Sequence, residues 1–192
     1  MPLLSKAMVE NRLARERLLQ TKNARAILME GSKAYHPGKI YDLFLSHSYS
    51  DAREVLAAKL LLEDAHLSVY VDWIEDSHLD RSLVTPKTAD HLRHRMENCH
   101  GLLYLTTENA SRSVWMPWEL GYFDGKKGTV AVLPVSERRS DSEYYDGQEY
   151  LGLYPYVTYR EGDSASDTRF FIHAQTKPIS DLRTWLHSDL TT

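Results

Sequence analysis

The amino-acid sequence predicts an α/β fold, namely a flavodoxin-like three-layer sandwich around a five-stranded parallel sheet. From residue 40 onward, short apolar runs alternate with segments of helical periodicity. Such alternation implies parallel strands joined by right-handed crossovers. Five strands suit the order 2-1-3-4-5, which places a ligand beyond the carboxyl ends of the strands, beside the first strand.

The composition is that of an ordinary globular chain. Of 192 residues, 42% are apolar and 26% charged. The net charge of −4 argues against a nucleic-acid partner, which favours a basic protein. The sequence contains neither an apolar stretch of transmembrane length nor a secretory leader. We therefore expect a cytoplasmic protein with no membrane partner, and the single cysteine, Cys99, fits a reducing compartment.

Residues 1–30 differ in composition from the rest, with six basic residues, three acidic residues and no glycine. They predict a helix that ends at Gly31, followed by a turn at residues 36–38. We therefore divide the chain into a helical extension with its linker (1–38) and an α/β domain (39–192). The extension is either a solvated helix packed on its own domain or a self-association helix.

The predicted strands are short and mostly apolar, as buried parallel strands are. They cover residues 40–46, 67–72, 102–106, 129–135 and 154–159. The intervening helices begin at capping residues. The caps are Asp51, which with Glu54 resembles a capping box, Thr85 before Pro86, and Ser113, and a last helix covers residues 178–190.

Trp115 and Glu119 are the strongest candidates for chemistry. They lie four residues apart on a predicted helix and therefore share a face. A carboxylate beside a large aromatic ring is partly desolvated, which strengthens its field, and it can stabilise an oxocarbenium-like ribosyl transition state. The alternative is structural, because a glutamate near a helix N-terminus interacts favourably with the helix dipole.

Two further segments follow predicted strands. Residues 46–49 (Ser46, His47, Ser48 and Tyr49) follow the first strand and could hold phosphate oxygens or simply form a capping turn. Asp72 ends the second strand and Trp73 follows it, a place where an aspartate can bind ribose. A phosphate-accepting receiver domain is disfavoured, because the first strand leads into Ser-His-Ser rather than an acidic pair.

No metal site is expected, since four candidate ligands lack a convergent arrangement: His91, His94, Cys99 and His100.

Four segments together resemble a TIR (Toll/interleukin-1 receptor) domain of the bacterial kind. They are FLSHSYSD (44–51), VYVDW (69–73), LLYLTTENASRSVWMPWELGYF (102–123) and VAVLPV (130–135). The most specific element is the Ser-x-x-x-Trp-x-x-x-Glu run that follows the third strand. The chain departs from the family in carrying His66 where many members have glycine before the second strand. The loop after that strand also lacks a glycine or proline near its tip.

The resemblance implies an enzyme that cleaves the nicotinamide–ribose bond of NAD+. Glu119 matches the catalytic glutamate of TIR enzymes, and Trp115 matches the aromatic residue of the same site. The segment 46–49 and the loop 73–85 would line the nucleotide pocket. NAD+ is then the substrate, and no cofactor or metal is required. The product would be ADP-ribose or a cyclic ADP-ribose isomer.

The resemblance also implies partners and a setting. Many bacterial members act in anti-phage defence, and a TIR protein without a fused sensor resembles the signal-producing partner of a two-gene system such as Thoeris. A downstream effector would sense the nucleotide, and TIR surfaces would mediate self-association. Two alternatives stay open. A non-enzymatic TIR adaptor would not need Glu119, and a nucleoside deoxyribosyltransferase-like enzyme would exchange nucleosides without consuming NAD+.

Overall fold

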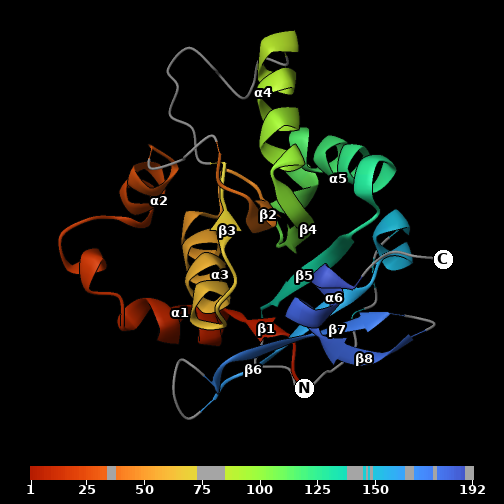
Figure 1. Cartoon of the computed structure of the whole chain (residues 1–192). Helices are drawn as coiled ribbons and strands as arrows, with labels where there is room; N and C mark the ends of the chain where they lie inside the picture. Colours follow the sequence, from red (N-terminus) through yellow and green to blue (C-terminus); the bar gives the residue numbers. More distant parts are fainter. Residues whose placement is uncertain are drawn as a thin grey trace.

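The structure is a computed structural model, and it describes residues 1–33, 38–72, 85–137, 145, 147, 149–162, 167–174 and 177–188. Figure 1 shows the arrangement of its elements. In chain order they are β1 (Leu4–Ser5), α1 (Lys6–Ala14), η1 (Arg17–Gln20), α2 (Ala24–Lys33), β2 (Tyr41–Ser46), α3 (Ala52–Asp64), β3 (Val69–Tyr70), α4 (Pro86–Glu97), β4 (Cys99–Thr106), η2 (Ala110–Arg112), α5 (Trp115–Lys127), β5 (Val130–Ser136), η3 (Glu149–Leu153), β6 (Tyr156–Arg160), β7 (Arg169–Ala174), β8 (Lys177–Asp181) and α6 (Leu182–His187).

The α/β architecture and the predicted strand order are confirmed. The strands occur side by side as β3-β2-β4-β5-β6, which is the order 2-1-3-4-5 of the five expected strands. Each neighbouring pair among them is parallel. The carboxyl ends of β2 and β4 therefore meet at one edge of the sheet, where a ligand site is expected.

The predicted number of strands is wrong, because the sheet has eight strands within the described residues. After β6 the sheet continues into β7 and β8, which are antiparallel, and β1 pairs with the end of β5. In β7, buried Phe170 and Ile172 alternate with partly exposed residues, which is the two-residue period of a strand. The predicted helix over residues 178–190 begins too early. Pro178 lies in the edge strand β8, where a missing backbone donor is tolerated, and the last helix begins at Leu182.

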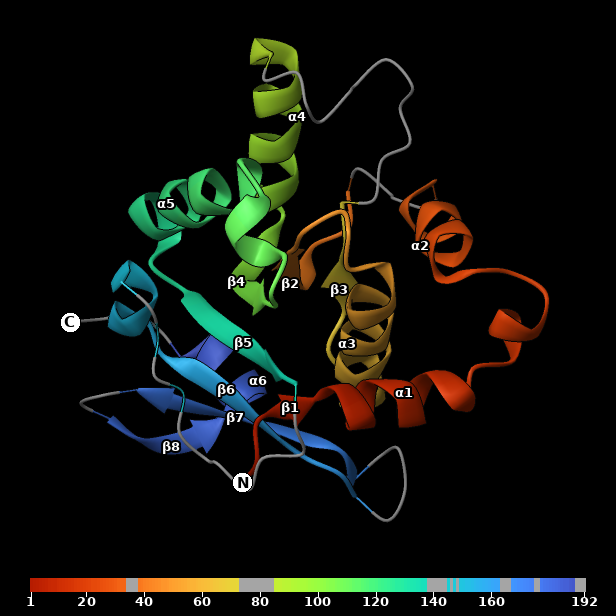
Figure 2. The same cartoon turned by 180° about the vertical axis from the view of Figure 1, so that it is seen from behind.

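Helices cover both faces of the sheet. Leu43, Leu45 and Leu103 point to the face covered by α1, α2 and α3, whereas Phe44 and Leu102 point to the face covered by α4 and α5. Figures 1 and 2, which view the molecule from opposite sides, both show these two groups of helices apart from each other. Alternation along β2 therefore sends Ser46 to the same face as Phe44, toward α5.

The N-terminal segment differs from one continuous helix. It consists of β1, α1, η1 and α2, with the break between α1 and α2 at residues 15–23. Val9 and Leu13 of α1 are buried in the same apolar core as α3, and β1 pairs in parallel with β5. These contacts fit the first of the two sequence interpretations, in which the segment packs on its own domain. In the described part of the chain, no helix combines the length and apolarity that a membrane crossing needs.

The helix starts show which capping predictions hold. Thr85 caps α4, since its Oγ1 accepts the Thr88 N–H at 3.2 Å, and Ser113 Oγ accepts the Met116 N–H at 3.3 Å at the start of α5. The predicted capping box at α3 is wrong, because Asp51 makes no side-chain bond to that helix. Its carboxylate binds elsewhere, as described below.

His66 occupies a left-handed backbone conformation, with φ of 61°. Helix α3 ends in a Schellman motif. The His66 N–H donates to Glu63 O at 2.9 Å, and the Leu67 N–H donates to Leu62 O at 3.0 Å. The position that departs from the family pattern thus keeps the backbone geometry that favours glycine.

We expect His66→Gly to stabilise the protein by about 0.5–1 kcal/mol, because glycine adopts this conformation without the side-chain clash but loses more entropy on folding. For a chain of this size, that corresponds to a rise in melting temperature of about 1–4 °C, measured by calorimetry. His66→Ala keeps a Cβ and serves as the control, with little change expected. Destabilisation by glycine would contradict this account.

Candidate active site

The centre of the candidate site is a buried hydrogen bond between two elements. Ser46 at the end of β2 donates from its Oγ to Glu119 Oε2 of α5 at 2.5 Å. Ser46 is fully buried, and Glu119 is only 1% exposed. A carboxylate held in this way is fixed in position, and its field acts through a medium less polarisable than water.

Trp115 lies one helical turn before Glu119 and is also buried. Its ring packs edge-on against Trp118, with the ring centroids 5.5 Å apart. Trp115 and Glu119 are thus both buried on α5, four residues apart as the sequence indicates, and Trp115 forms an aromatic contact in the first turn of that helix.

Tyr104 is a site residue that the sequence analysis did not single out. It is the Cα partner of Ser46 across β2 and β4, so both side chains point to the α5 face. Burial raises the pKa of Tyr104, and the neighbouring Tyr150 and Glu119 raise it further. Its phenol therefore stays protonated near neutral pH. The signal available in the sequence was the alternation of Leu-Leu-Tyr-Leu-Thr, but the register with Ser46 is a tertiary feature.

A cavity of about 670 Å³ is lined in part by Tyr104. Its lining comes from the end of β4, the first turn of α5 and η3, and includes Tyr104, Thr106, Pro117 and Tyr150. Tyr104 both lines this cavity and interacts electrostatically with Glu119. Among the described residues, none of the site residues predicted from the sequence lines this cavity, so Tyr104 is what connects it to the Ser46–Glu119 pair.

The three residues after Ser46 differ in burial and in the contacts that they make. His47 is buried, and its Nδ1–H donates to Leu45 O at 2.8 Å, which fixes the ring against its own strand. Ser48 is buried, and its Oγ accepts the Ser50 N–H at 3.4 Å within the turn that leads into α3. Tyr49 is 39% exposed and lies under the Arg25 guanidinium of α2.

Asp72 lies beyond the end of β3 and is buried. The Tyr70 hydroxyl donates to Asp72 Oδ1 at 3.2 Å, and burial together with the Asp72 charge raises the Tyr70 pKa. Tyr70 belongs to the core between the sheet and α4–α5, so Asp72, two residues later, is placed on the same face as Ser46. Trp73 lies outside the described residues, as does the loop up to residue 84.

A second buried carboxylate joins the two loops that flank the site. Asp51 accepts hydrogen bonds from the Thr107 hydroxyl and from Asn109 Nδ2, the latter at 2.6 Å. The loop after β2 is thereby tied to the loop after β4. The sequence pattern predicts a helix cap at Asp51 and gives no indication of its contacts with Thr107 and Asn109.

Comparisons with known proteins show the family to which the chain belongs. No family model matches the chain. It is 48% identical over 170 residues to the protein named probable 3′ cyclic ADP-D-ribose synthase ThsB′ of Bacillus cereus (strain MSX-D12), an alignment that covers 88% of each chain. The chain belongs to the bacterial TIR family of the Thoeris type. Within this family it is also 35% identical over 100 residues to the putative cyclic ADP-D-ribose synthase TIR2 of Cytobacillus dafuensis, which covers 52% of this chain and 26% of that protein.

Family membership indicates which chemistry this geometry serves. The buried Ser46–Glu119 pair comes from the two segments on which the TIR resemblance was most specific, the Phe-Leu-Ser-His opening and the Trp-x-x-x-Glu run. A preorganised carboxylate, an adjacent indole and a cavity at the carboxyl edge of a parallel sheet suit the stabilisation of positive charge on a bound ligand.

Proposed function

We propose that this TIR protein cleaves the nicotinamide–ribose bond of NAD+ and closes the remaining ADP-ribosyl group into a cyclic ADP-ribose isomer. The observation that carries the proposal is the buried Ser46–Glu119 hydrogen bond, in a chain 48% identical to a relative named as a cyclic ADP-D-ribose synthase. Glu119 is the proposed catalytic residue. Trp115, Tyr49, Asp72 and the segment Ser46–Ser48 form the proposed pocket, together with Trp73.

The chemistry needs a single carboxylate. The bond between ribose C1′ and the nicotinamide nitrogen breaks, and its electron pair leaves with the nitrogen, so that nicotinamide departs neutral and needs no proton. Positive charge then develops on the ribosyl ring, where the Glu119 carboxylate stabilises it. A nucleophile of the adenosine half captures C1′ and loses its proton, which gives the cyclic product. Capture by water gives ADP-ribose instead.

The burial of Glu119 places a requirement on how the substrate binds. With Glu119 only 1% exposed, the reacting ribose reaches the carboxylate only when neighbouring side chains move aside. Substrate binding would then exclude water from the site as it forms, which favours the internal nucleophile over hydrolysis. This order of events is consistent with a cyclase rather than a simple hydrolase.

The proposal extends to the cellular role. The cyclic nucleotide acts as an immune signal in anti-phage defence and is sensed by a downstream effector. The protein works in the cytoplasm, where NAD+ is available, and assembles through TIR surfaces. These points rest on the family relationship.

The direct test is to incubate the purified protein with NAD+ and to identify the products by chromatography and mass spectrometry. The protein is used at high concentration, with and without a crowding agent that favours assembly. We expect nicotinamide and an equimolar nucleotide product that is one water lighter than ADP-ribose. ADP-ribose alone would show hydrolysis without cyclisation, and intact NAD+ under every condition would contradict the enzyme assignment.

A further inference from the structure

Helix α2, from the segment that precedes the first TIR strand, contacts Tyr49 in the segment that follows β2. We propose that Arg25 of this helix binds the pyrophosphate of the dinucleotide, with the Tyr49 ring holding its guanidinium in place. This inference rests on the proposed function, since it assigns the phosphate-binding cation of the same site. It makes the N-terminal segment part of the binding site.

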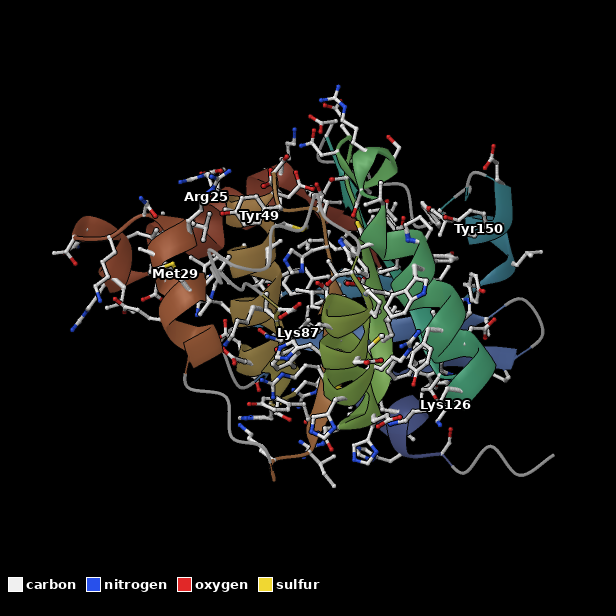
Figure 3. All side chains as sticks on the ribbon, turned by 90° about the horizontal axis from the view of Figure 1, so that it is seen from above. Arg25, Met29, Tyr49, Lys87, Lys126 and Tyr150 are labelled. Atoms are coloured by element: carbon white, nitrogen blue, oxygen red, sulfur yellow. The ribbon has the colours of Figure 1, made fainter. Side chains whose placement is uncertain are left out.

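The contact that carries the inference joins α2 to the segment after β2. The Arg25 guanidinium carbon lies 4.9 Å from the centroid of the Tyr49 ring. Figure 3 shows Arg25 and Tyr49 next to each other, on the side of α2 that faces the body of the protein. Both side chains are accessible, Arg25 being exposed and Tyr49 39% exposed. A ligand could therefore reach the guanidinium from solvent.

Arg25 also lines a cavity of about 630 Å³ between η1–α2 and the start of α3. Two other basic residues line it, and each is paired with a carboxylate. Lys22 Nζ lies 2.6 Å from Glu30 Oε2, and Arg53 binds Glu10 through two nitrogens. Arg25 differs in that its contact is an aromatic ring, which leaves the positive charge uncompensated by a neighbouring carboxylate in that contact.

The charges deeper in the site make such a cation necessary. Glu119, Asp72 and Asp51 are all buried carboxyl residues around the ends of β2 and β3. They suit the positive charge on the nicotinamide ribose but repel the two negative charges of a pyrophosphate. A dinucleotide therefore needs positive charge farther out, at the rim of the site. Ser46 and Tyr49 are three residues apart, a stretch that spans at most about 10 Å, so one extended ligand can reach both.

The guanidinium is suited to this role. Its planar fork donates two parallel hydrogen bonds to phosphate oxygens, which a lysine cannot do. Stacking on an aromatic face leaves the donor edge of the fork open and reduces the entropy lost when a ligand orders the side chain. Tyr49 is then a positioning residue for Arg25.

The test measures binding rather than turnover, so that it does not depend on the catalytic proposal. The probes are ADP-ribose, which contains the pyrophosphate, and adenosine, which has no phosphate, and both are titrated calorimetrically into the full-length protein. We expect Arg25→Ala to weaken ADP-ribose binding about tenfold, the size of a lost charge-assisted hydrogen bond. Adenosine binding should not change. Arg25→Lys should fall in between, and added salt should reduce the difference between wild type and Arg25→Ala.

Variants of the neighbouring residues separate a phosphate contact from a structural effect. Tyr49→Leu removes the ring beneath Arg25 and should bind ADP-ribose two- to threefold more weakly, whereas Tyr49→Phe, which keeps the ring, should lose less. Arg183→Ala, at the opposite edge of the sheet, is the matched control and should behave as wild type. The proposal is overturned if Arg25→Ala binds ADP-ribose as the wild type does. It is equally overturned if adenosine binding falls by the same factor, or if the wild type does not bind ADP-ribose at all. NAD+ cleavage by the wild type, measured separately, decides the catalytic proposal.

Discussion

Replacement of Glu119 by glutamine is expected to lower the rate of NAD+ cleavage about 100- to 1000-fold, the usual loss when one preorganised electrostatic group is removed. Glutamine has nearly the same shape and its amide oxygen can still accept the Ser46 hydrogen bond, now seen at 2.5 Å. The negative charge that opposes the developing ribosyl cation is lost. Because the effect lies in the transition state, kcat should fall far more than KM rises.

Two comparisons make this result specific. Glu63→Gln changes an exposed carboxylate in the last turn of α3, away from the cavity, and should leave turnover unchanged. Ser46→Ala removes the donor that fixes Glu119 but keeps its charge, so we expect an intermediate loss of about tenfold, the size of one hydrogen bond to a charged group. Melting temperatures of all three variants show whether the fold is intact. Turnover by a folded Glu119→Gln protein at near wild-type rate would rule out the catalytic assignment.

The sequence predicts the central sheet well because buried parallel strands carry a strong local signal. The runs at residues 102–106 and 129–135 are almost wholly apolar, and they correspond to the strands β4 and β5. Helices between them bury one face, so their periodicity is clear. The position of the site at the carboxyl edge then follows from topology alone, and residues 46–49 and 115–119 fall there as expected.

The strands that the sequence analysis missed lack that signal. Strand β8 contains Pro178, which resembles a helix start when only the local sequence is considered. Strand β7 shows an alternation of buried and partly exposed residues over only six positions. Its pairing with β6 stabilises it as a strand, whereas the β propensity of its residues alone does not predict one. Strand β1 has two residues and forms only because the end of β5 is available to it.

Contacts within the site between segments far apart in the chain could not be predicted from the sequence either. Spacing placed Trp115 and Glu119 on one helix face, but the partner of Glu119 depends on how α5 crosses the end of β2. Likewise, Arg25 and Tyr49 meet only because α2 turns back along α3. Such contacts join residues far apart in the chain, and only the resemblance to TIR domains pointed to Ser46 and Glu119 as members of one site.

For Asp51, the local sequence pattern and the structure predict different losses of stability on mutation. The local pattern assigned it to an N-cap, and a lost cap costs about 1 kcal/mol. In the structure it is 2% exposed and accepts bonds from Thr107 and Asn109 across the site. We therefore expect Asp51→Ala to lower the free energy of unfolding by about 2–4 kcal/mol, because two partly buried donors lose a charged, buried acceptor. The melting temperature should fall by about 4–16 °C.

Asp51→Ser distinguishes the two accounts. Serine is among the best N-cap residues, but its side chain is too short to bind Thr107 and Asn109 together. If Asp51 acts as a tie between loops, Asp51→Ser should be nearly as unstable as Asp51→Ala, and Thr107→Val should cost much less in the Asp51→Ala background than in the wild type. If Asp51→Ser melts like the wild type, the cap explains the residue and the tie does not. In the first case NAD+ turnover should fall as well, since both loops that flank Ser46 and Glu119 lose their mutual support.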